Sequence, residues 1–342
     1  DFTWETVTQM DFGFDASFLN NRLTGTFDWY RRNTKDMLVA GATLPATLGA
    51  SVPKSNSADM KTIGWELSLG WNDRLENGFS YWVKGVLSDY QATITKYAGN
   101  DAGFYSQSDG DGKYYVGQKI GEIWGYHSNG LFQSDDEAAT IDQSELYAGK
   151  WGAGDVKYED LDNDGKITKG EETIYNPGDK SIIGNKTPRY QFGITVGFDY
   201  KNFDFEMFWQ GTGKRDYMLS GAQFWGFTSQ WDVPYTPALD YWTETNTDAY
   251  FPRPGWQNGG NRVTSDRYLQ SAAYGRLKNL TVGYTIPKNL TTKWGISRLR
   301  LYVTGENLLT ITPLNDAFDP ETLGGLTYPI NRKVAIGLNL TL

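Results

Sequence analysis

Two neighbouring segments decide the fold class, MDFGFDASF at residues 10–18 and LTGTFDWY at residues 23–30. In both, apolar or aromatic side chains alternate with polar residues or glycine. This is the period of a β-strand whose two faces meet different surroundings. A short turn at Asn20 and Asn21 separates the segments, so they are expected to be consecutive strands.

The same alternation returns along the chain and predicts an all-β fold with about nine antiparallel strands. The expected strands lie near residues 6–18, 22–33, 62–72, 79–93, 189–200, 203–211, 273–286, 297–311 and 332–342.

Short and long connections alternate between these strands. The long connections have about 28, 95, 61 and 20 residues, which is unusual for soluble domains and ordinary for outer-membrane barrels. The two largest, residues 95–188 and 212–272, are predicted extracellular loops. Bacterial single-chain barrels have an even number of strands, so nine strands are not expected to close alone. A soluble β-sandwich or β-barrel is the alternative that periodicity leaves open.

Composition narrows the class of protein further. The 342 residues carry a formal net charge of −9, 39 Gly, no Cys and 15 % aromatic residues. No apolar run approaches the roughly 18–20 residues of a membrane helix. The acidic balance, with scattered Lys and Arg, argues against a nucleic-acid partner. The chain opens on DFTWE, without an initiator Met or a signal-peptide pattern, and is expected to be part of a longer protein.

Several motifs carry a resemblance to one family. They are LTGTFDWYRRNT at 23–34, KTIGWEL at 61–67, GQKIGEIWGY at 117–126, GDVKY at 154–158, QGTG at 210–213, GRLKNL at 275–280 and LRLYVTGENL at 299–308. With these motifs the chain resembles the C-terminal part of the SusC/RagA family of TonB-dependent outer-membrane transporters.

The resemblance implies a location, a mechanism and partners. It implies residues 1–342 are part of a 22-stranded barrel of the Gram-negative outer membrane, with the plug and the earlier strands upstream. It also implies import of nutrient oligomers, glycans first and peptides as the other class. The implied partners are a SusD-like surface lipoprotein, TonB acting through the upstream part, and outer-membrane lipid. The alternative is a soluble or surface β-rich carbohydrate-binding protein stabilised by calcium.

Residues 160–171, DLDNDGKITKGE, fit the twelve-residue calcium loop. Such loops place carboxylates at positions 1, 3 and 5, glycine at 6 and glutamate at 12, because Ca²⁺ takes six or more oxygens. The expected ligands are Asp160, Asp162, Asp164, the carbonyl of Lys166, Thr168 and Glu171. The flanking segments lack helical patterns, so a structural Ca²⁺ is expected rather than a sensor.

Catalysis has little support in the sequence. His127 is the only His, so neither a Ser-His-Asp triad nor a His-rich zinc site is expected. Asp135, Asp136 and Glu137 resemble a glycosidase carboxylate pair only superficially, since they lie in a predicted loop. No enzyme is predicted.

The long loops are rich in Trp and Tyr, which suit sugar faces, partner docking or packing between loops. The candidate substrate or partner contacts are Trp124, Tyr126, Trp225, Trp231, Trp242 and Trp256. The polar positions that alternate with the apolar face are expected to line a barrel lumen or to touch the plug. They include Asp15, Asp28, Glu66, Lys84, Asp204, Glu206 and Arg300.

Overall fold

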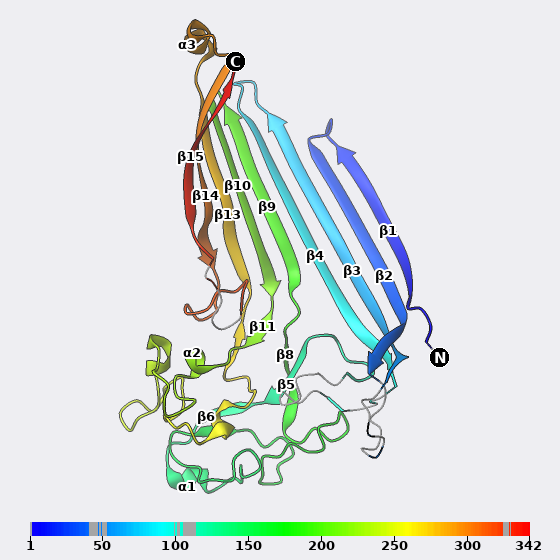
Figure 1. Cartoon of the computed structure of the whole chain (residues 1–342), viewed down its shortest axis with the longest axis vertical. Helices are drawn as coiled ribbons and strands as arrows, with labels where there is room; N and C mark the ends of the chain where they lie inside the picture. The colour runs from blue at the N-terminus through cyan, green and yellow to red at the C-terminus, as the bar shows by residue number, and fades with distance from the viewer. Residues whose placement is uncertain are drawn as a thin grey trace.

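Nine antiparallel strands form one sheet in the computed structural model (Figure 1). The structure describes residues 2–40, 47, 49, 53–98, 100, 103–104, 114–323, 328 and 330–342. In sheet order the strands are β1 (Thr6–Phe18), β2 (Leu23–Ala40), β3 (Lys54–Arg74), β4 (Ser80–Tyr97), β9 (Arg189–Tyr200), β10 (Phe203–Lys214), β13 (Tyr274–Thr285), β14 (Arg298–Ile311) and β15 (Lys333–Thr341). The predicted fold class is therefore confirmed.

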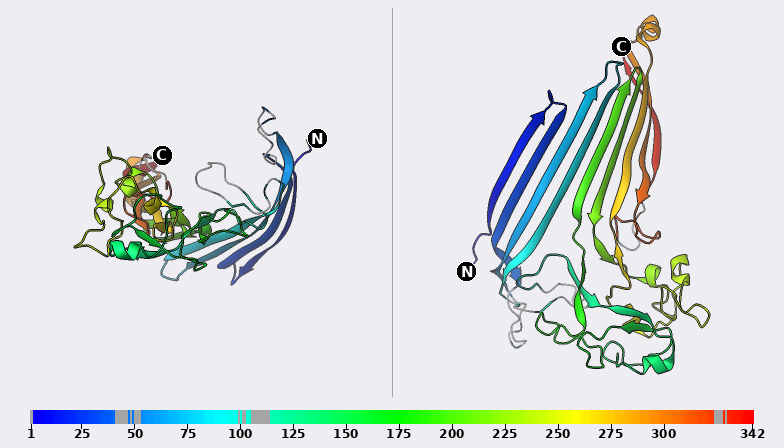
Figure 2. Two further views of the ribbon diagram at one scale, coloured as in Figure 1. Left: turned by 90° about the horizontal axis from the view of Figure 1, so that it is seen from below. Right: turned by 180° about the vertical axis from the view of Figure 1, so that it is seen from behind.

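The sheet is an open, curved wall rather than a closed barrel. β1 and β15 form its two edges, and each pairs with one neighbour only among the described strands. Figure 2 shows the wall end-on as an arc whose first and last strands lie far apart. The described helices include none long and apolar enough to cross a membrane.

The ladder register separates the two faces of the wall. Phe12 pairs with Trp29, Trp29 with Trp65, and the apolar series continues strand by strand on the same face. Many of these side chains are exposed, although they are large and apolar. The exposed members include Met10, Phe12, Phe14, Leu69, Val83, Ile194, Val282, Leu301, Val303, Val334, Ile336, Leu338 and Leu340.

The opposite face is polar and concave. Near the short turns it encloses a hollow of about 820 Å³ lined by Trp82, Asp204, Glu206 and Arg300 among others. Arg300 forms an ion pair with Asp204 across this hollow. Rings on this face also cover glycines of the neighbouring strand, such as Tyr30 over Gly64. An apolar outer face and a polar inner face are the pattern of a membrane barrel wall.

The strand ends at the short turns are close to those predicted, whereas β2 and β3 are longer than expected. The turn after β1 places Asn20 and Asn21 at positive φ, a conformation that Asn tolerates well. β2 continues to Ala40 and β3 begins at Lys54, beyond the predicted limits of 33 and 62. Register shifts between Thr34 and Leu38 on β2, and between Asp59 and Met60 on β3, break the hydrophobic alternation there while the backbone ladder continues.

The long connections gather at one end of the wall and fold together (Figure 1). They contain three two-stranded sheets, in which β5 (Glu122–Tyr126) pairs with β8 (Lys180–Asn185), β6 (Ser128–Leu131) with β7 (Val156–Tyr158), and β11 (Asp216–Met218) with β12 (Leu269–Ser271). The α-helices are α1 (Asp135–Ala138), α2 (Ala222–Trp225) and, at the opposite end, α3 (Lys288–Thr291). Short 3₁₀ turns span Thr236–Leu239, Gly259–Arg262 and Thr292–Trp294.

Most of the large buried side chains of the described chain lie in these connections, not in the sheet. Tyr158, Phe224 and Tyr268 are fully buried in one cluster, which Leu314 and Leu323 of the β14–β15 connection also join. We call this assembly, formed by residues 114–188, 215–273 and 312–323, the loop cluster. The two large connections run over 98–188 and 215–273, and residues 99, 101–102 and 105–113 of the first lie outside the described residues.

Candidate functional site

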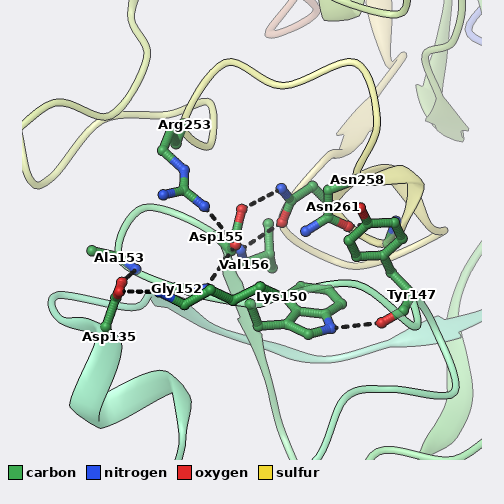
Figure 3. Close-up of polar contacts among 12 residues, drawn as sticks. Asp135, Tyr147, Lys150, Gly152, Ala153, Asp155, Val156, Arg253, Asn258 and Asn261 are labelled. Atoms are coloured by element: carbon green, nitrogen blue, oxygen red, sulfur yellow. Dashed lines mark hydrogen bonds and ion pairs between the residues drawn. The ribbon is translucent and has the colours of Figure 1, made fainter.

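Asp155 holds the two large connections together (Figure 3). Its carboxylate accepts hydrogen bonds from Gly152 N at 2.9 Å, Asn261 Nδ2 at 2.8 Å and Arg253 Nη2 at 3.1 Å. Asn261 Oδ1 in turn accepts from Val156 N at 2.8 Å. Because Asp155 is buried and fully partnered, it fixes one loop against the other at little desolvation cost.

A second polar group attaches the β14–β15 connection to β13. Arg276 is buried and donates to Asp319 at 2.5 Å, and Lys278 donates to Glu321 at 2.9 Å. Arg276 Nη1 also lies 3.1 Å from Glu321 Oε1, and neither of these two atoms takes part in a hydrogen bond. We therefore treat that contact as charge attraction alone. The sequence analysis did not anticipate this third connection in the cluster.

A pocket of about 740 Å³ opens in the loop cluster. The β5–β8 ribbon forms one wall, and residues 217–220 and 262–264 form the other. The lining combines aromatic rings with charged groups, namely Trp124, Tyr126, Trp225, Glu122, Glu172, Lys169, Lys180, Lys186 and Arg262. The volume is within the usual range of small-ligand sites, but the six charged side chains make this lining more polar than is usual for them.

The six predicted aromatic contacts separate into three groups. Trp124, Tyr126 and Trp225 line the pocket while packing in the loop cluster. Trp124, for example, stacks on Phe104 with ring centroids 4.1 Å apart. Trp242 is buried outside the pocket lining, and Trp231 and Trp256 are exposed. Packing is therefore a demonstrated role of four of them, and ligand contact stays a prediction.

Tyr126 is a lining residue of the pocket whose side chain is buried. Burial raises the pKa of its phenol, and the carboxylates of Glu145 and Glu172 act in the same direction. Its hydroxyl donates to the carbonyl oxygen of Thr168 at 3.4 Å. The phenol therefore stays neutral and joins the pocket to the predicted calcium loop.

The predicted calcium loop has the backbone of a tight carboxylate turn. Asp160 accepts hydrogen bonds from Asn163 N at 2.7 Å and from Gly165 N at 2.8 Å, and Gly165 has φ +86°. Asp164 accepts from Lys166 N at 2.8 Å. The backbone thus makes the sharp turn at Gly165 that is expected at position 6 of a calcium loop.

Asp179 completes a carboxylate group that the sequence analysis missed. Oxygens of Asp160, Asp162 and Asp179 lie within 4.8 Å of one another, whereas Asp164 and Glu171 are not in that group. Asp179 is buried and accepts from Leu161 N and Thr168 N, both at 2.7 Å. Desolvation and the neighbouring charges of Asp164 and Asp179 raise the pKa of Asp162. The sequence signal for Asp179 is weak because it follows the twelve-residue motif by eight positions.

His127 contradicts one expectation of the sequence analysis. Its Nδ1 lies 2.7 Å from Asp266 Oδ2, and its Nε2 lies 2.6 Å from Ser181 Oγ. This is the bonding order of a Ser-His-Asp triad, which a single His is enough to build. Asp266 also accepts from Ser128 N at 2.9 Å, so the group links three segments of the loop cluster.

The carboxylates of α1 are used for capping and ion pairs. Ser134 caps the helix, accepting from Glu137 N at 3.1 Å. Asp135 pairs with Lys150 at 2.5 Å, and Glu137 pairs with Lys157 at 2.9 Å. These contacts account for both carboxylates without glycoside chemistry.

Comparison with known proteins identifies the family. The family model described as "TonB dependent receptor-like, beta-barrel" matches residues 1–308. The chain belongs to this family. It is accordingly part of an outer-membrane protein of Gram-negative bacteria, in a family of TonB-dependent receptors. The soluble alternative of the sequence analysis is therefore wrong.

Curated relatives and solved structures agree with this assignment. TonB-dependent receptor P3 of Formosa agariphila is 30 % identical over 98 % of this chain and 34 % of its own length. TonB-dependent receptor SusC of Bacteroides thetaiotaomicron is 26 % identical over 98 % of this chain and 32 % of its own. The RagAB peptide transporter structure matches with a TM-score of 0.75, at 22 % identity, over 98 % of this chain and 35 % of that chain. The chain thus spans about a third of the relatives' length.

Proposed function

We propose that this chain forms the C-terminal barrel wall of a SusC-like, TonB-dependent transporter that imports nutrient oligomers. The observation that carries the proposal is the sheet itself, which is apolar outside, polar on its concave side and open at both edges. Open edges need further strands, and the relatives are about three times longer. The wall would thus enclose a polar path, with the loop cluster at its outer mouth.

Glycans are the proposed substrate class. The pocket in the loop cluster offers Trp124 and Trp225 beside charged and hydrogen-bonding groups, a combination that suits sugar rings and hydroxyls. Peptides are the second candidate, because the RagAB structure, which shares this fold, is that of a peptide transporter. The charges of Glu122, Lys186 and Arg262 in the lining suit peptide termini as well.

The proposed partners follow from the same reading. A SusD-like surface lipoprotein would close over the loop cluster, and TonB would act through the upstream part of the receptor. The exposed rings of Trp231 and Trp256 offer apolar area for the lipoprotein. No covalent step is needed, because capture and release alone transfer the substrate.

Uptake by intact cells tests this proposal. A strain lacking the full-length receptor should lose uptake of labelled oligosaccharides, and the wild-type gene should restore it. Loss of peptide uptake instead would select the second candidate. Unchanged uptake of both classes would contradict import by this receptor.

We further propose that a structural Ca²⁺ binds at Asp160, Asp162 and Asp179, with the Lys166 carbonyl among its ligands. Three carboxylates that converge within 4.8 Å supply the hard oxygen donors that Ca²⁺ prefers. The ion would offset the repulsion among these carboxylates and fix the loop between β7 and β8. In this arrangement Asp179, and not Glu171, supplies the last carboxylate of the motif.

Two matched variants of the full-length receptor distinguish these carboxylates. Asp179→Asn should weaken Ca²⁺ binding about tenfold or more, and Glu171→Gln should leave it within about twofold, because only Asp179 joins the carboxylate group. Calorimetric titration with Ca²⁺ measures both. The reverse order would restore the sequence-based ligand set, and no binding by the wild-type protein would contradict a calcium site altogether.

A further inference from the structure

Three cationic residues extend the lipid-facing side of the wall at its long-loop end. Arg31, Lys35 and Lys61 follow the apolar series of β2 and β3 in strict alternation. Trp29 pairs with Phe12, Arg31 with Met10 and Lys35 with Thr6, so Arg31 and Lys35 share the outward face. Lys61 pairs with Asn33 and follows Ile63 on that same face. We call these three residues the basic rim.

The basic rim lies where the hydrocarbon layer should end. From Trp71 to Ile63 the outward residues of β3 are apolar or aromatic. These eight steps of about 3.4 Å, tilted by roughly 40°, cover about 20 Å of the membrane normal. The apolar band of such barrels is about 25 Å tall. Lys61 therefore lies at the upper boundary, where lipid headgroups begin.

The three cations have no ion-pair partner among the described residues, although acidic groups are near. Arg31 donates to Asn33 at 3.3 Å. Glu5 accepts from Leu38 N, and Asp59 accepts from Asp36 N, so both acids have backbone partners.

Arg22, at the short-turn end of the wall, differs from the basic rim because it has an ion-pair partner. It is paired with Asp73 at 3.2 Å and lies over the ring of Trp71. A cation in contact with lipid that lacks a protein partner is costly unless its charge reaches headgroups.

At the height of Arg31 and Lys61 the outward positions of the following strands are uncharged, although Asp89 lies below them and Lys96 above them on the same face of β4. The uncharged positions include Gln91 and Thr93 on β4, Tyr190 on β9, Gly211 on β10, and Leu309 and Ile311 on β14. The outward positive charge is thus concentrated on β2, β3 and the adjoining end of β4, where Lys96 lies opposite Asp59, in a chain whose net charge is −9. A localised patch, continuous with the lipid-facing band, points to a specific anionic lipid group and not to general attraction.

We propose that the basic rim binds the phosphate groups of outer-leaflet lipopolysaccharide. Arg31 offers a planar guanidinium for a phosphate, and Lys35 and Lys61 supply flexible ammonium groups on either side. The acyl chains would lie against Ile63, Trp29 and Met10 below. The proposal depends on the outer-membrane location and is independent of what the receptor transports.

Bilayer nanodiscs that hold the full-length receptor test the proposal. Phosphatidylcholine discs are prepared with lipopolysaccharide or with its enzymatically dephosphorylated form, and bound lipid is measured by native mass spectrometry. The wild-type receptor should retain the phosphorylated lipid preferentially. Equal retention of the two forms would overturn the proposal, and this comparison needs no variant that could fail to fold.

Matched double variants locate the binding site. Arg31→Gln with Lys61→Gln should lower lipopolysaccharide retention by about fivefold per cation, since each contributes about 1 kcal/mol near an anionic surface. Arg32→Gln with Lys84→Gln makes the same changes on the concave face and should leave retention unchanged. Equal loss of retained lipopolysaccharide in both pairs of variants would contradict the assignment.

Discussion

Tyr268 of the loop cluster is fully buried, whereas Ile336 of β15 is 83 % exposed. The two regions of the chain thus place their apolar side chains in opposite ways. The loop cluster packs aromatic rings inward, as a soluble domain does, and the wall turns its apolar side chains outward. Water surrounds the first and lipid the second, so one sequence obeys two rules for burial. The comparison predicts different responses to the same kind of substitution.

The largest expected effect is in the loop cluster. Phe224 is fully buried and meets Phe251, Tyr268 and Phe318 edge-on. Phe224→Ala should destabilise the cluster by about 3–5 kcal/mol, because it leaves a cavity among rigid rings. Hydrogen exchange should accelerate in residues 215–273 and stay unchanged in the wall. Equal acceleration in both regions would mean that they unfold as one unit.

A charge on the lipid face should have the next largest effect. Leu67→Arg places a guanidinium in mid-wall on the outward face and should cost about 2–4 kcal/mol. Ser68→Arg, one residue further along and on the concave face, is the matched control and should cost little. The heat-modifiable fraction on electrophoresis of the full-length receptor measures assembly. Equal assembly of the two variants would argue against lipid on the outer face.

The Asp155 junction should show a smaller, local effect. Asp155→Ala leaves the amide of Asn261 and the N–H of Gly152 without their acceptor, and we expect a total cost of about 1–3 kcal/mol, the range for a buried polar group left unpaired. Limited proteolysis should cut residues 132–158 and 253–262 faster than in the wild type. A serine substitution of exposed Asp136 serves as the control. Unchanged cleavage would show that the aromatic core alone joins the two loops.

Acid should have the smallest effect, at α1. Hydrogen bonds and charge attraction from Lys150, together with the N–H of Ala153, lower the pKa of Asp135. The N–H of Gln133, then Lys157, lowers the pKa of Glu137. A lowered pKa gives stability that is present above the unfolded pKa, near 4, and is lost as pH falls through the folded value. Exchange at α1, corrected for intrinsic rates, should therefore rise between about pH 5 and 3. A flat profile, or the same rise in Asp135→Asn with Glu137→Gln, would contradict this.

Much of the wall was predictable from the sequence. Successive side chains of a strand point to opposite faces, so a strand with one apolar and one polar face shows an alternation with a period of two residues. The alternation around Phe12, Phe27 and Ile336 locates β1, β2 and β15 without any structure. Beyond Thr34 the register of β2 against β3 shifts twice, so the alternation ends before the strand does. The alternation of apolar and polar residues reflects the surroundings of the two faces, whereas the backbone hydrogen bonds of the strand do not depend on it.

The loop cluster was less predictable because its contacts join distant segments. Asp155 meets Asn261, and Asp160 meets Asp179, through turns with no periodic pattern. The three two-stranded sheets, and the packing of the β14–β15 connection into the cluster, were not predicted for the same reason. The aromatic residues were found, but their spacing does not show that Tyr126, Trp225 and Trp242 are packed inward.

Alternating cysteine accessibility along β15 tests the central claim most directly, since this chain has no Cys of its own. Single Cys residues at positions 334–338 of the full-length receptor, cleared of other thiols, are labelled in bilayers. Labels at 334, 336 and 338 should be quenched by a nitroxide in the lipid tails, and labels at 335 and 337 should not be. Quenching without a two-residue period, or stronger quenching at 335 and 337, would contradict a wall with lipid outside and a polar path inside.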